Sequence, residues 1–215
     1  MANSRYIAIE GPIGVGKTSL ARRLAAELDG ELVLEEAESN PFLQRFYEDP
    51  RGAALPAQLF FLFQRSRQLE QLAQADMFSE VRIADFLLAK DRLFAEITLD
   101  RDELALYGKI HDTLEIRPPA PDLVVYLQAP VDTLLFRIAQ RGINYEQAIS
   151  RRYLERLTDA YSQFFHQYNE SPLLIVNAAT IDPVNNEHHF QMLLEEIDGA
   201  RSGRQFFNPL VSAFA

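Results

Sequence analysis

The sequence predicts an α/β fold in which a five-stranded parallel sheet lies between two layers of helices. Three observations support this prediction: strand-like and helix-like segments alternate, a glycine-rich loop joins the first strand to the first helix, and acidic residues follow two strands. Alternation of this kind is typical of parallel sheets, because each crossover between parallel strands usually contains a helix. At 215 residues, and with no linker-like segment, the chain is expected to form a single domain over residues 1–215.

Five short apolar segments are expected to form the strands of this sheet. They cover residues 5–9, 31–36, 81–86, 121–129 and 172–178. Between them apolar residues recur at helical spacing, as Leu20, Leu24 and Leu28 do in the first helix. The expected helices cover residues 19–28, 40–47, 53–75, 94–115, 130–142, 147–168 and 185–197. The tail at 199–215 is expected either to dock or to fray.

The composition argues against several classes of protein. With 21 basic and 31 acidic residues, the net charge of −10 disfavours nonspecific binding to nucleic acid or anionic membranes. Cysteine is absent, which excludes thiol catalysis, disulfides and cysteine-ligated zinc. The chain starts without a charged leader and apolar run, and no segment reaches about 18 consecutive apolar residues. We therefore expect a cytoplasmic, soluble protein with no membrane or nucleic-acid partner.

The glycine-rich loop after the first strand fits a phosphate-binding motif. Gly11, Gly16, Lys17 and Thr18 match G-x-x-x-x-G-K-[ST], and the match lies between a predicted strand and a predicted helix, as the motif requires. In such loops backbone N–H groups surround phosphate oxygens, the lysine reaches the terminal phosphates and the hydroxyl binds Mg²⁺. The motif predicts a three-layer fold of the P-loop NTPase type that binds ATP, or a similar triphosphate, with Mg²⁺. The residues expected to hold this donor are Gly11, Pro12, Ile13, Gly14, Val15, Gly16, Lys17 and Thr18.

Acidic residues follow the second and third predicted strands. Glu35 and Glu36 end the second strand, and Asp85 ends the third. Ligands of open α/β sheets bind beyond the carboxyl ends of the strands. A kinase acting on a hydroxyl needs one carboxylate to accept the proton and an acid that holds Mg²⁺. Glu35 and Asp85 are candidates for these tasks, although single acidic residues are also common as solvated surface charge. No N-K-x-D segment is present, which argues against a switch-type GTPase.

The long helix expected at 53–75 carries three side chains suited to a nucleobase. Gln58, Phe61 and Arg65 are three and four residues apart and therefore share one face. An amide can pair with the edge of a base, an aromatic ring can stack on it, and a guanidinium can bond its carbonyl or ring nitrogen. A core stripe with polar flanks would give the same spacing, so the pattern alone leaves both interpretations open.

Taken together, these features resemble the deoxynucleoside kinases, specifically the bacterial deoxyadenosine and deoxyguanosine kinase branch of the family that includes deoxycytidine kinase. The resemblance covers nearly the whole chain. It is carried in order by "IAIEGPIGVGKTSL", "LEEAESNPFLQRFYED", "LFFLFQRSRQLEQL", "IADFLLAKDRLFAEITL" and "RIAQRGINYEQAISRRYLERLTDAY". The family phosphorylates the 5′-hydroxyl of a deoxynucleoside from a nucleoside triphosphate, and the resemblance implies this activity here.

The resemblance also implies roles for individual residues. Glu35 matches the family's general base, Gln58 the glutamine that pairs with the nucleobase, and Arg65 its base-contacting arginine, while Phe61 is a looser match to an aromatic wall. Tyr47 and Glu146 match the pair that grips the 3′-hydroxyl. With Asp85, the expected substrate-binding residues are Tyr47, Gln58, Phe61, Arg65, Asp85 and Glu146.

The segment from about 137 to 152 resembles the family's lid over the donor phosphates. Arg137 and Arg141 are four residues apart on a helix, so both can face a transferring phosphoryl group. Ile143 occupies the place of a further lid arginine found in many members, and Arg151 or Arg152 is a possible substitute. The expected catalytic residues are then Glu35, Lys17, Arg137 and Arg141.

The segment after the third strand departs from the animal members of the family. Many of them carry E-R-S there, whereas this chain has Ala84-Asp85-Phe86, as the bacterial branch tends to. Asp85 is an acid and cannot take the role of the arginine in that triplet. We assign it either to the binding of Mg²⁺, together with Thr18, or to organisation of the phosphate site. Asp91 is expected either to face the base or to form a surface ion pair with Arg92.

Two other functions compete with a deoxynucleoside kinase. A thymidylate-type nucleoside monophosphate kinase shares the loop and lid, but the carboxylates in "LEEAESN" would repel the phosphate of its acceptor. A subunit that binds nucleotide without catalysis is disfavoured by the intact Lys17, Thr18 and Glu35. Base preference is left open with a lean to purine deoxynucleosides, and a homodimer is expected because many members of the family are dimers. His188 and His189 are not expected to bind metal, and Glu10 has no assigned role.

Overall fold

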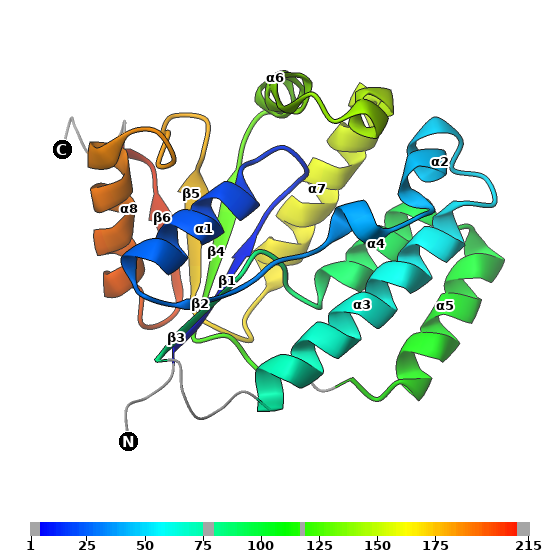
Figure 1. The fold of residues 1–215 in the computed structure, drawn as a ribbon, viewed down its shortest axis with the longest axis horizontal. Helices are drawn as coiled ribbons and strands as arrows, with labels where there is room; N and C mark the ends of the chain where they lie inside the picture. Colours follow the sequence, from blue (N-terminus) through cyan, green and yellow to red (C-terminus); the bar gives the residue numbers. More distant parts are fainter. Residues whose placement is uncertain (1–4, 75–79, 117–118, 210–215) are drawn as a thin grey trace.

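Six parallel strands form one sheet in this computed structural model, which describes residues 5–74, 80–116 and 119–209. The strand order is β2-β3-β1-β4-β5-β6 (Figure 1). The strands are β1 (Arg5–Glu10), β2 (Glu31–Val33), β3 (Val81–Ala84), β4 (Leu123–Gln128), β5 (Leu173–Asn177) and β6 (Arg204–Phe207). The predicted parallel α/β sheet is confirmed, and the strands that bear the expected site residues, β1, β2 and β3, are neighbours within it.

The prediction of five strands was wrong, because part of the tail forms a sixth. β6 pairs in parallel with β5, with Leu173 opposite Arg204 and Val176 opposite Phe207. It has four residues, of which Phe207 is buried and Phe206 is exposed. A short edge strand with so little apolar alternation carries a weak sequence signal. Up to residue 209 the tail therefore docks on the sheet, and its last residues, 210–215, lie outside the described segments.

Eight α-helices and two 3₁₀ helices connect the strands within the described segments. They are α1 (Lys17–Glu27), η1 (Ala37–Ser39), α2 (Leu43–Glu48), α3 (Ala54–Gln74), α4 (Lys90–Thr98), α5 (Arg101–Thr113), α6 (Val131–Arg141), η2 (Asn144–Ala148), α7 (Arg151–Gln167) and α8 (Glu187–Gly199). The helix expected over 94–115 is divided in two. Asp100 caps α5 and forms a capping box with Glu103, which starts a new helix at that point.

Helices cover both faces of the sheet, as the three-layer prediction requires. On one face α1 packs beside α8, with the guanidinium of Arg23 4.0 Å from the ring centre of Phe190. On the other face α7 packs against β4, where the ring centres of Tyr126 and Phe165 are 4.1 Å apart. α4 contacts α7, and α3 and α5 lie beyond α4 (Figure 1). The loops at the carboxyl ends of β1, β2 and β3 therefore face the space bordered by α3, α4 and α7.

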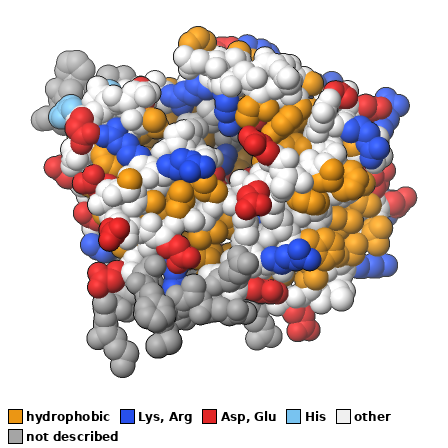
Figure 2. All heavy atoms as spheres, in the orientation of Figure 1, with side chains coloured by type: hydrophobic (Ala, Val, Ile, Leu, Met, Phe, Trp, Pro, Cys, Tyr) orange, Lys and Arg blue, Asp and Glu red, His pale blue; other side chains and the backbone are white. Residues whose placement is uncertain are grey.

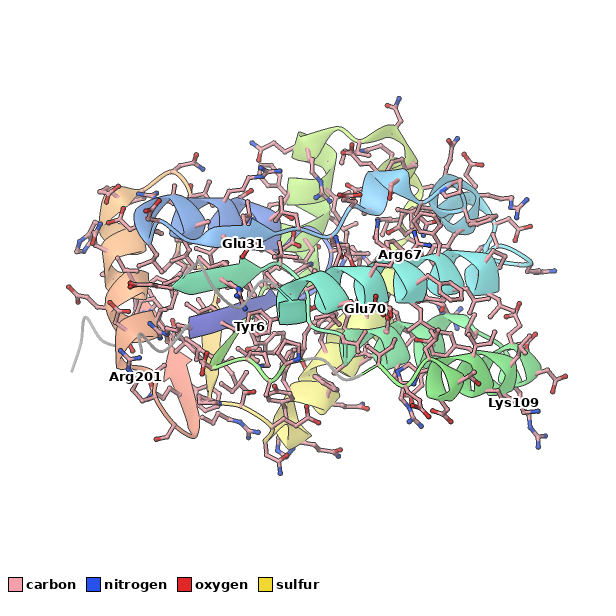
Figure 3. All side chains as sticks on the ribbon, turned by 60° about the horizontal axis from the view of Figure 1, so that its bottom comes forward. Tyr6, Glu31, Arg67, Glu70, Lys109 and Arg201 are labelled. Carbon is pink, nitrogen blue, oxygen red and sulfur yellow. The ribbon has the colours of Figure 1, made fainter. Side chains whose placement is uncertain are left out.

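The apolar first half of α3 is only partly covered. Leu62 is fully buried, but Phe63 is 46% exposed, and Leu106 of the neighbouring α5 is 48% exposed. Figure 2 shows hydrophobic side chains gathered on the side of the molecule where α3 and α5 lie. Lys109 of α5 points away from the protein (Figure 3). No helix in the described residues is long and apolar enough to span a bilayer.

Candidate active site

The phosphate loop joins β1 to α1 in the predicted place, and its glycines are required by close packing. Gly11 has φ +148°, and a Cβ there would lie 2.5 Å from the carbonyl oxygen of Leu127. A Cβ at Gly14 would lie 2.9 Å from the carbonyl oxygen of Leu134. Both approaches are too close for any side chain, so the loop is shaped by β4 and α6 beneath it. Lys17 lies inside this loop and donates to the carbonyl oxygen of Gly11 at 2.7 Å.

Asp85 links the phosphate loop to the end of β2. Its Oδ2 accepts from the Thr18 hydroxyl at 2.5 Å, and its Oδ1 accepts from the backbone N–H of Glu35 at 2.7 Å. A hydroxyl and a carboxylate side by side next to a phosphate loop are ligands that suit Mg²⁺, which usually takes one or two carboxylates plus substrate phosphates. The described residues contain no cluster of three or more acidic, histidine or cysteine side chains that would hold a metal alone. The residues present therefore fit Mg²⁺ bound together with a nucleotide.

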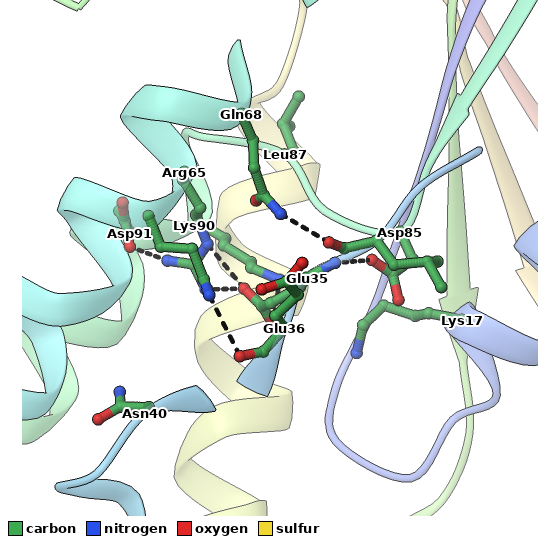
Figure 4. Close-up of polar contacts among 12 residues, drawn as sticks. Lys17, Glu35, Glu36, Asn40, Arg65, Gln68, Asp85, Leu87, Lys90 and Asp91 are labelled. Atoms are coloured by element: carbon green, nitrogen blue, oxygen red, sulfur yellow. Dashed lines mark hydrogen bonds and ion pairs between the residues drawn. The ribbon is translucent and has the colours of Figure 1, made fainter. Parts of the chain in front are cut away.

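Glu35 is held between two cationic side chains. Its Oε1 accepts from Nε of Arg65 at 2.7 Å, and its Oε2 lies 3.2 Å from Nζ of Lys90 (Figure 4). Burial alone would raise the pKa of Glu35, but the charges of Arg65 and Lys90 outweigh it and lower the pKa to about 2. The carboxylate is therefore ionised at neutral pH and lies directly beyond the carboxyl end of β2.

Arg65 connects Glu35 to a second buried acid. Its Nη1 forms an ion pair with Asp91, which is 0% exposed, and its guanidinium lies 4.9 Å from the ring centre of Phe61. The expected surface pair of Asp91 with Arg92 was wrong: Arg92 is on the exterior and pairs with Glu96 one turn along α4. Adjacent residues on a helix point in different directions, whereas residues four apart share a face.

A cavity of about 130 Å³ joins the predicted acceptor residues. It is lined, among others, by all six side chains expected to bind substrate, namely Tyr47, Gln58, Phe61, Arg65, Asp85 and Glu146. Glu35, Lys17 and Thr18 line the same cavity at its phosphate-loop side. Residues from six separate parts of the chain thus meet at one place, which neither a core stripe nor solvated surface charge would produce.

Three of the side chains that line this cavity, Gln58, Tyr47 and Glu146, differ in how far their neighbours occupy them. Gln58 donates through Nε2 to the Thr98 hydroxyl at 3.3 Å, while its Oε1 is buried without a partner in the described structure. Tyr47 stacks on Tyr145, with ring centres 6.2 Å apart. Glu146 is buried beside them and accepts from Arg141 at 2.7 Å. Burial raises the pKa of Glu146, and the charge of Arg141 opposes that rise.

A larger cavity of about 650 Å³ lies on the other side of the phosphate loop, between α6 and residues 178–185. Arg137 and Arg141 both line it, as the lid prediction requires. Their partners differ, however, because Arg137 donates to the carbonyl oxygens of Val15 and Ala178 at 3.0 and 2.8 Å, whereas Arg141 pairs with Glu146. Arg141 lines both cavities and so lies between them.

The suggested replacements for the missing lid arginine do not reach the site. Arg151 forms an exposed ion pair with Asp132, and neither Arg151 nor Arg152 lines either cavity. Sequence reasoning also missed five residues that line the 130 Å³ cavity, namely Ala37, Leu43, Lys90, Phe94 and Tyr161. A signal for Lys90 was available, since the chain has only three lysines, and this one follows a strand-end acid.

The sequence profile of the family described as "Deoxynucleoside kinase" matches residues 7–200. The chain belongs to the deoxynucleoside kinase family. It is therefore an enzyme, a phosphotransferase, and neither a thymidylate-type kinase nor a catalytically silent subunit is needed to explain its site.

Named relatives of this deoxynucleoside kinase cover almost all of the chain. Deoxyguanosine kinase of Bacillus subtilis is 35% identical over 92% of the chain and 98% of the relative, and deoxyadenosine kinase of Lactobacillus acidophilus is 30% identical over 90% and 95%. The solved structure of deoxyadenosine kinase from M. mycoides with bound dATP superimposes with a TM-score of 0.79 at 26% identity, covering 90% of this chain and 99% of that one.

Proposed function

We propose that this kinase transfers the γ-phosphoryl group of ATP, with Mg²⁺, to the 5′-hydroxyl of a purine deoxynucleoside in the cytoplasm, as a step of nucleotide salvage. The observation that carries the proposal is the 130 Å³ cavity, in which Glu35 lies between the phosphate loop and the side chains that suit a nucleoside. The names of the relatives, deoxyguanosine kinase and deoxyadenosine kinase, support the purine preference.

Catalysis would consist of positioning and electrostatic stabilisation. Glu35 orients the 5′-hydroxyl and accepts its proton as the phosphoryl group transfers. Lys17, Arg137 and Arg141 stabilise the negative charge that spreads over the phosphoryl oxygens. Thr18 and Asp85 would hold Mg²⁺, which when bound would add positive charge that stabilises the phosphates.

On the acceptor side, Tyr47 and Glu146 would hold the 3′-hydroxyl of the sugar. Phe61 would form an aromatic wall, and Gln58 would pair with the edge of the base. The unpartnered Oε1 of Gln58 favours a base that offers an N–H group, because a buried acceptor without a donor costs about 1–3 kcal/mol. Adenine and cytosine meet that requirement through their amino groups, guanine through N1–H and thymine through N3–H, so this contact supports binding of a nucleobase but does not by itself select a purine.

A coupled kinase assay tests this proposal with deoxyadenosine, deoxyguanosine, deoxycytidine, thymidine and dTMP as acceptors. We expect the highest kcat/KM with one of the two purine deoxynucleosides and no phosphorylation of dTMP. Preference for a pyrimidine deoxynucleoside would overturn the base assignment alone. Turnover of dTMP above all four nucleosides would indicate a monophosphate kinase instead.

We further propose that the face formed by α3 and α5 binds a second copy of the chain. The resemblance to a family with many dimers supports this, as do the exposed Phe63 and Leu106 on adjacent helices. Phe63→Glu should then convert a dimer to a monomer in light scattering, because a buried carboxylate would be left without a partner. Phe206→Glu, at a phenylalanine on β6 that is more exposed than Phe63, is the control and should leave the dimer intact. A wild-type chain that is monomeric at high concentration would refute the proposal.

A further inference from the structure

Glu10, the last residue of β1, is a buried carboxylate that joins four parts of the site. Its Oε2 accepts from the backbone N–H of Gly11 and from the Tyr161 hydroxyl, both at 2.8 Å. Its Oε1 accepts from the backbone N–H of Leu87 at 2.9 Å and lies 3.3 Å from Nζ of Lys90. Because each oxygen receives a backbone N–H, a carboxylate is required here: an amide would turn its own NH₂ toward one of these donors. Glu10 is 1% exposed and has no contact with the acceptor cavity.

Lys90, the first residue of α4, is a buried cation beside the Glu10 carboxylate. It is 3% exposed, and its Nζ lies between Oε1 of Glu10 and Oε2 of Glu35, at 3.3 and 3.2 Å. Only three of the 21 basic residues in this chain are lysines, and the other two are Lys17 in the phosphate loop and the exposed Lys109. The ammonium is a compact point charge, so it contacts both carboxylates at once.

We propose that Lys90, which Glu10 fixes in place, is a positioning residue. It holds the Glu35 carboxylate in a fixed position and orientation relative to the phosphate loop. Arg65 on α3 donates a hydrogen bond to one carboxylate oxygen of Glu35, and Lys90 on α4 forms an ion pair with the other. With Arg65 alone, the carboxylate would be free to turn about that contact. Glu10 is bonded to Gly11, so the same contacts tie the position of Glu35 to the first residue of the phosphate loop. This inference rests on the proposed role of Glu35 and extends it to the residues behind it.

Two other roles for Lys90 would leave different kinetic signatures. If its charge acted directly on the transferring phosphoryl group, its contribution would persist after Glu35 had been neutralised. If it served only to compensate buried acids, its loss would lower stability without a specific effect on turnover. If Lys90 acts through Glu35, its substitution must have no further effect on kcat once the Glu35 carboxylate is absent, because the effects of substituting two coupled residues are not additive.

A double-mutant cycle on the full-length enzyme separates these roles. Lys90→Met in the wild-type background is expected to lower kcat about 10²-fold with KM for ATP and deoxynucleoside nearly unchanged, as for a misplaced catalytic group. In the Glu35→Gln background the same change should lower kcat less than about twofold. Lys109→Met is the matched control, since this lysine points away from the protein on α5 (Figure 3), and it should behave as wild type.

Several outcomes would overturn the proposal. An equal loss of kcat in both backgrounds would assign Lys90 to the phosphoryl group itself, and a fall in thermal stability with unchanged kcat would make it purely structural. If Lys90→Met does not fold, the cycle is run with Lys90→Arg, which keeps the charge but displaces the contact. That variant should lower kcat only when Glu35 is present. The rate of the wild-type enzyme is measured in the same experiment. A wild-type enzyme without kinase activity would show that the proposed function is wrong, independently of the result for Lys90.

Discussion

Replacing Glu35 with glutamine is expected to lower kcat about 10²–10⁴-fold, the range over which positioned proton acceptors contribute. The amide keeps the size of the side chain and can still accept a hydrogen bond from Arg65, but it cannot take the proton of the 5′-hydroxyl. The contacts of Glu35 are with Arg65, Lys90 and Asp85, and none is with the cavity between α6 and residues 178–185. ATP binding should therefore survive.

The measurement is steady-state turnover together with the Kd for ATP and the thermal unfolding midpoint. Glu36→Gln is the matched control, because Glu36 is the next residue, is exposed and does not line either cavity. It should keep the wild-type rate. A wild-type rate in Glu35→Gln itself would remove Glu35 as the base, and a lost fold would show instead that its ion pairs are needed for stability.

The parts of the site that follow from local sequence were predictable. The phosphate loop needs a strand, glycines, a lysine and a helix in immediate succession, so the motif and its context are contained within Ile7–Leu20. Glu35 and Asp85 were found because the carboxyl ends of neighbouring parallel strands must meet at one edge of the sheet. Helical spacing predicted that Gln58 and Arg65 share one face, but a core stripe gives the same spacing, and their roles were assigned through the family resemblance.

The contacts that depend on distant segments were not predictable in this way. The partners of Glu10 include Leu87 and Tyr161, which are 77 and 151 residues away along the chain. Nothing in the sequence near Asp91 indicates that it pairs with Arg65 rather than with Arg92. β6 was missed for a related reason, since an edge strand is stabilised by its pairing with β5 more than by its own apolar pattern.

Replacing Lys17 with methionine is expected to lower kcat about 10²–10³-fold, the loss typical of removing one group that stabilises developing charge. It should also weaken ATP binding, while the affinity for the deoxynucleoside remains close to wild type. The ammonium donates to the carbonyl oxygens of Gly11 and Pro12, which place it inside the loop that is expected to surround the donor phosphates.

Stability should behave differently from activity in this variant. Burial lowers the pKa of Lys17 to about 8, which means that the folded protein disfavours the charged form relative to the unfolded chain. Removing the ammonium therefore relieves an unfavourable burial, and the unfolding midpoint of Lys17→Met at neutral pH should equal or exceed that of wild type. Calorimetric titration with ATP and thermal unfolding measure the two effects side by side. A variant that lost stability along with ATP binding would show that Lys17 holds the loop together, and a variant with unimpaired turnover would place the phosphate contact on another residue.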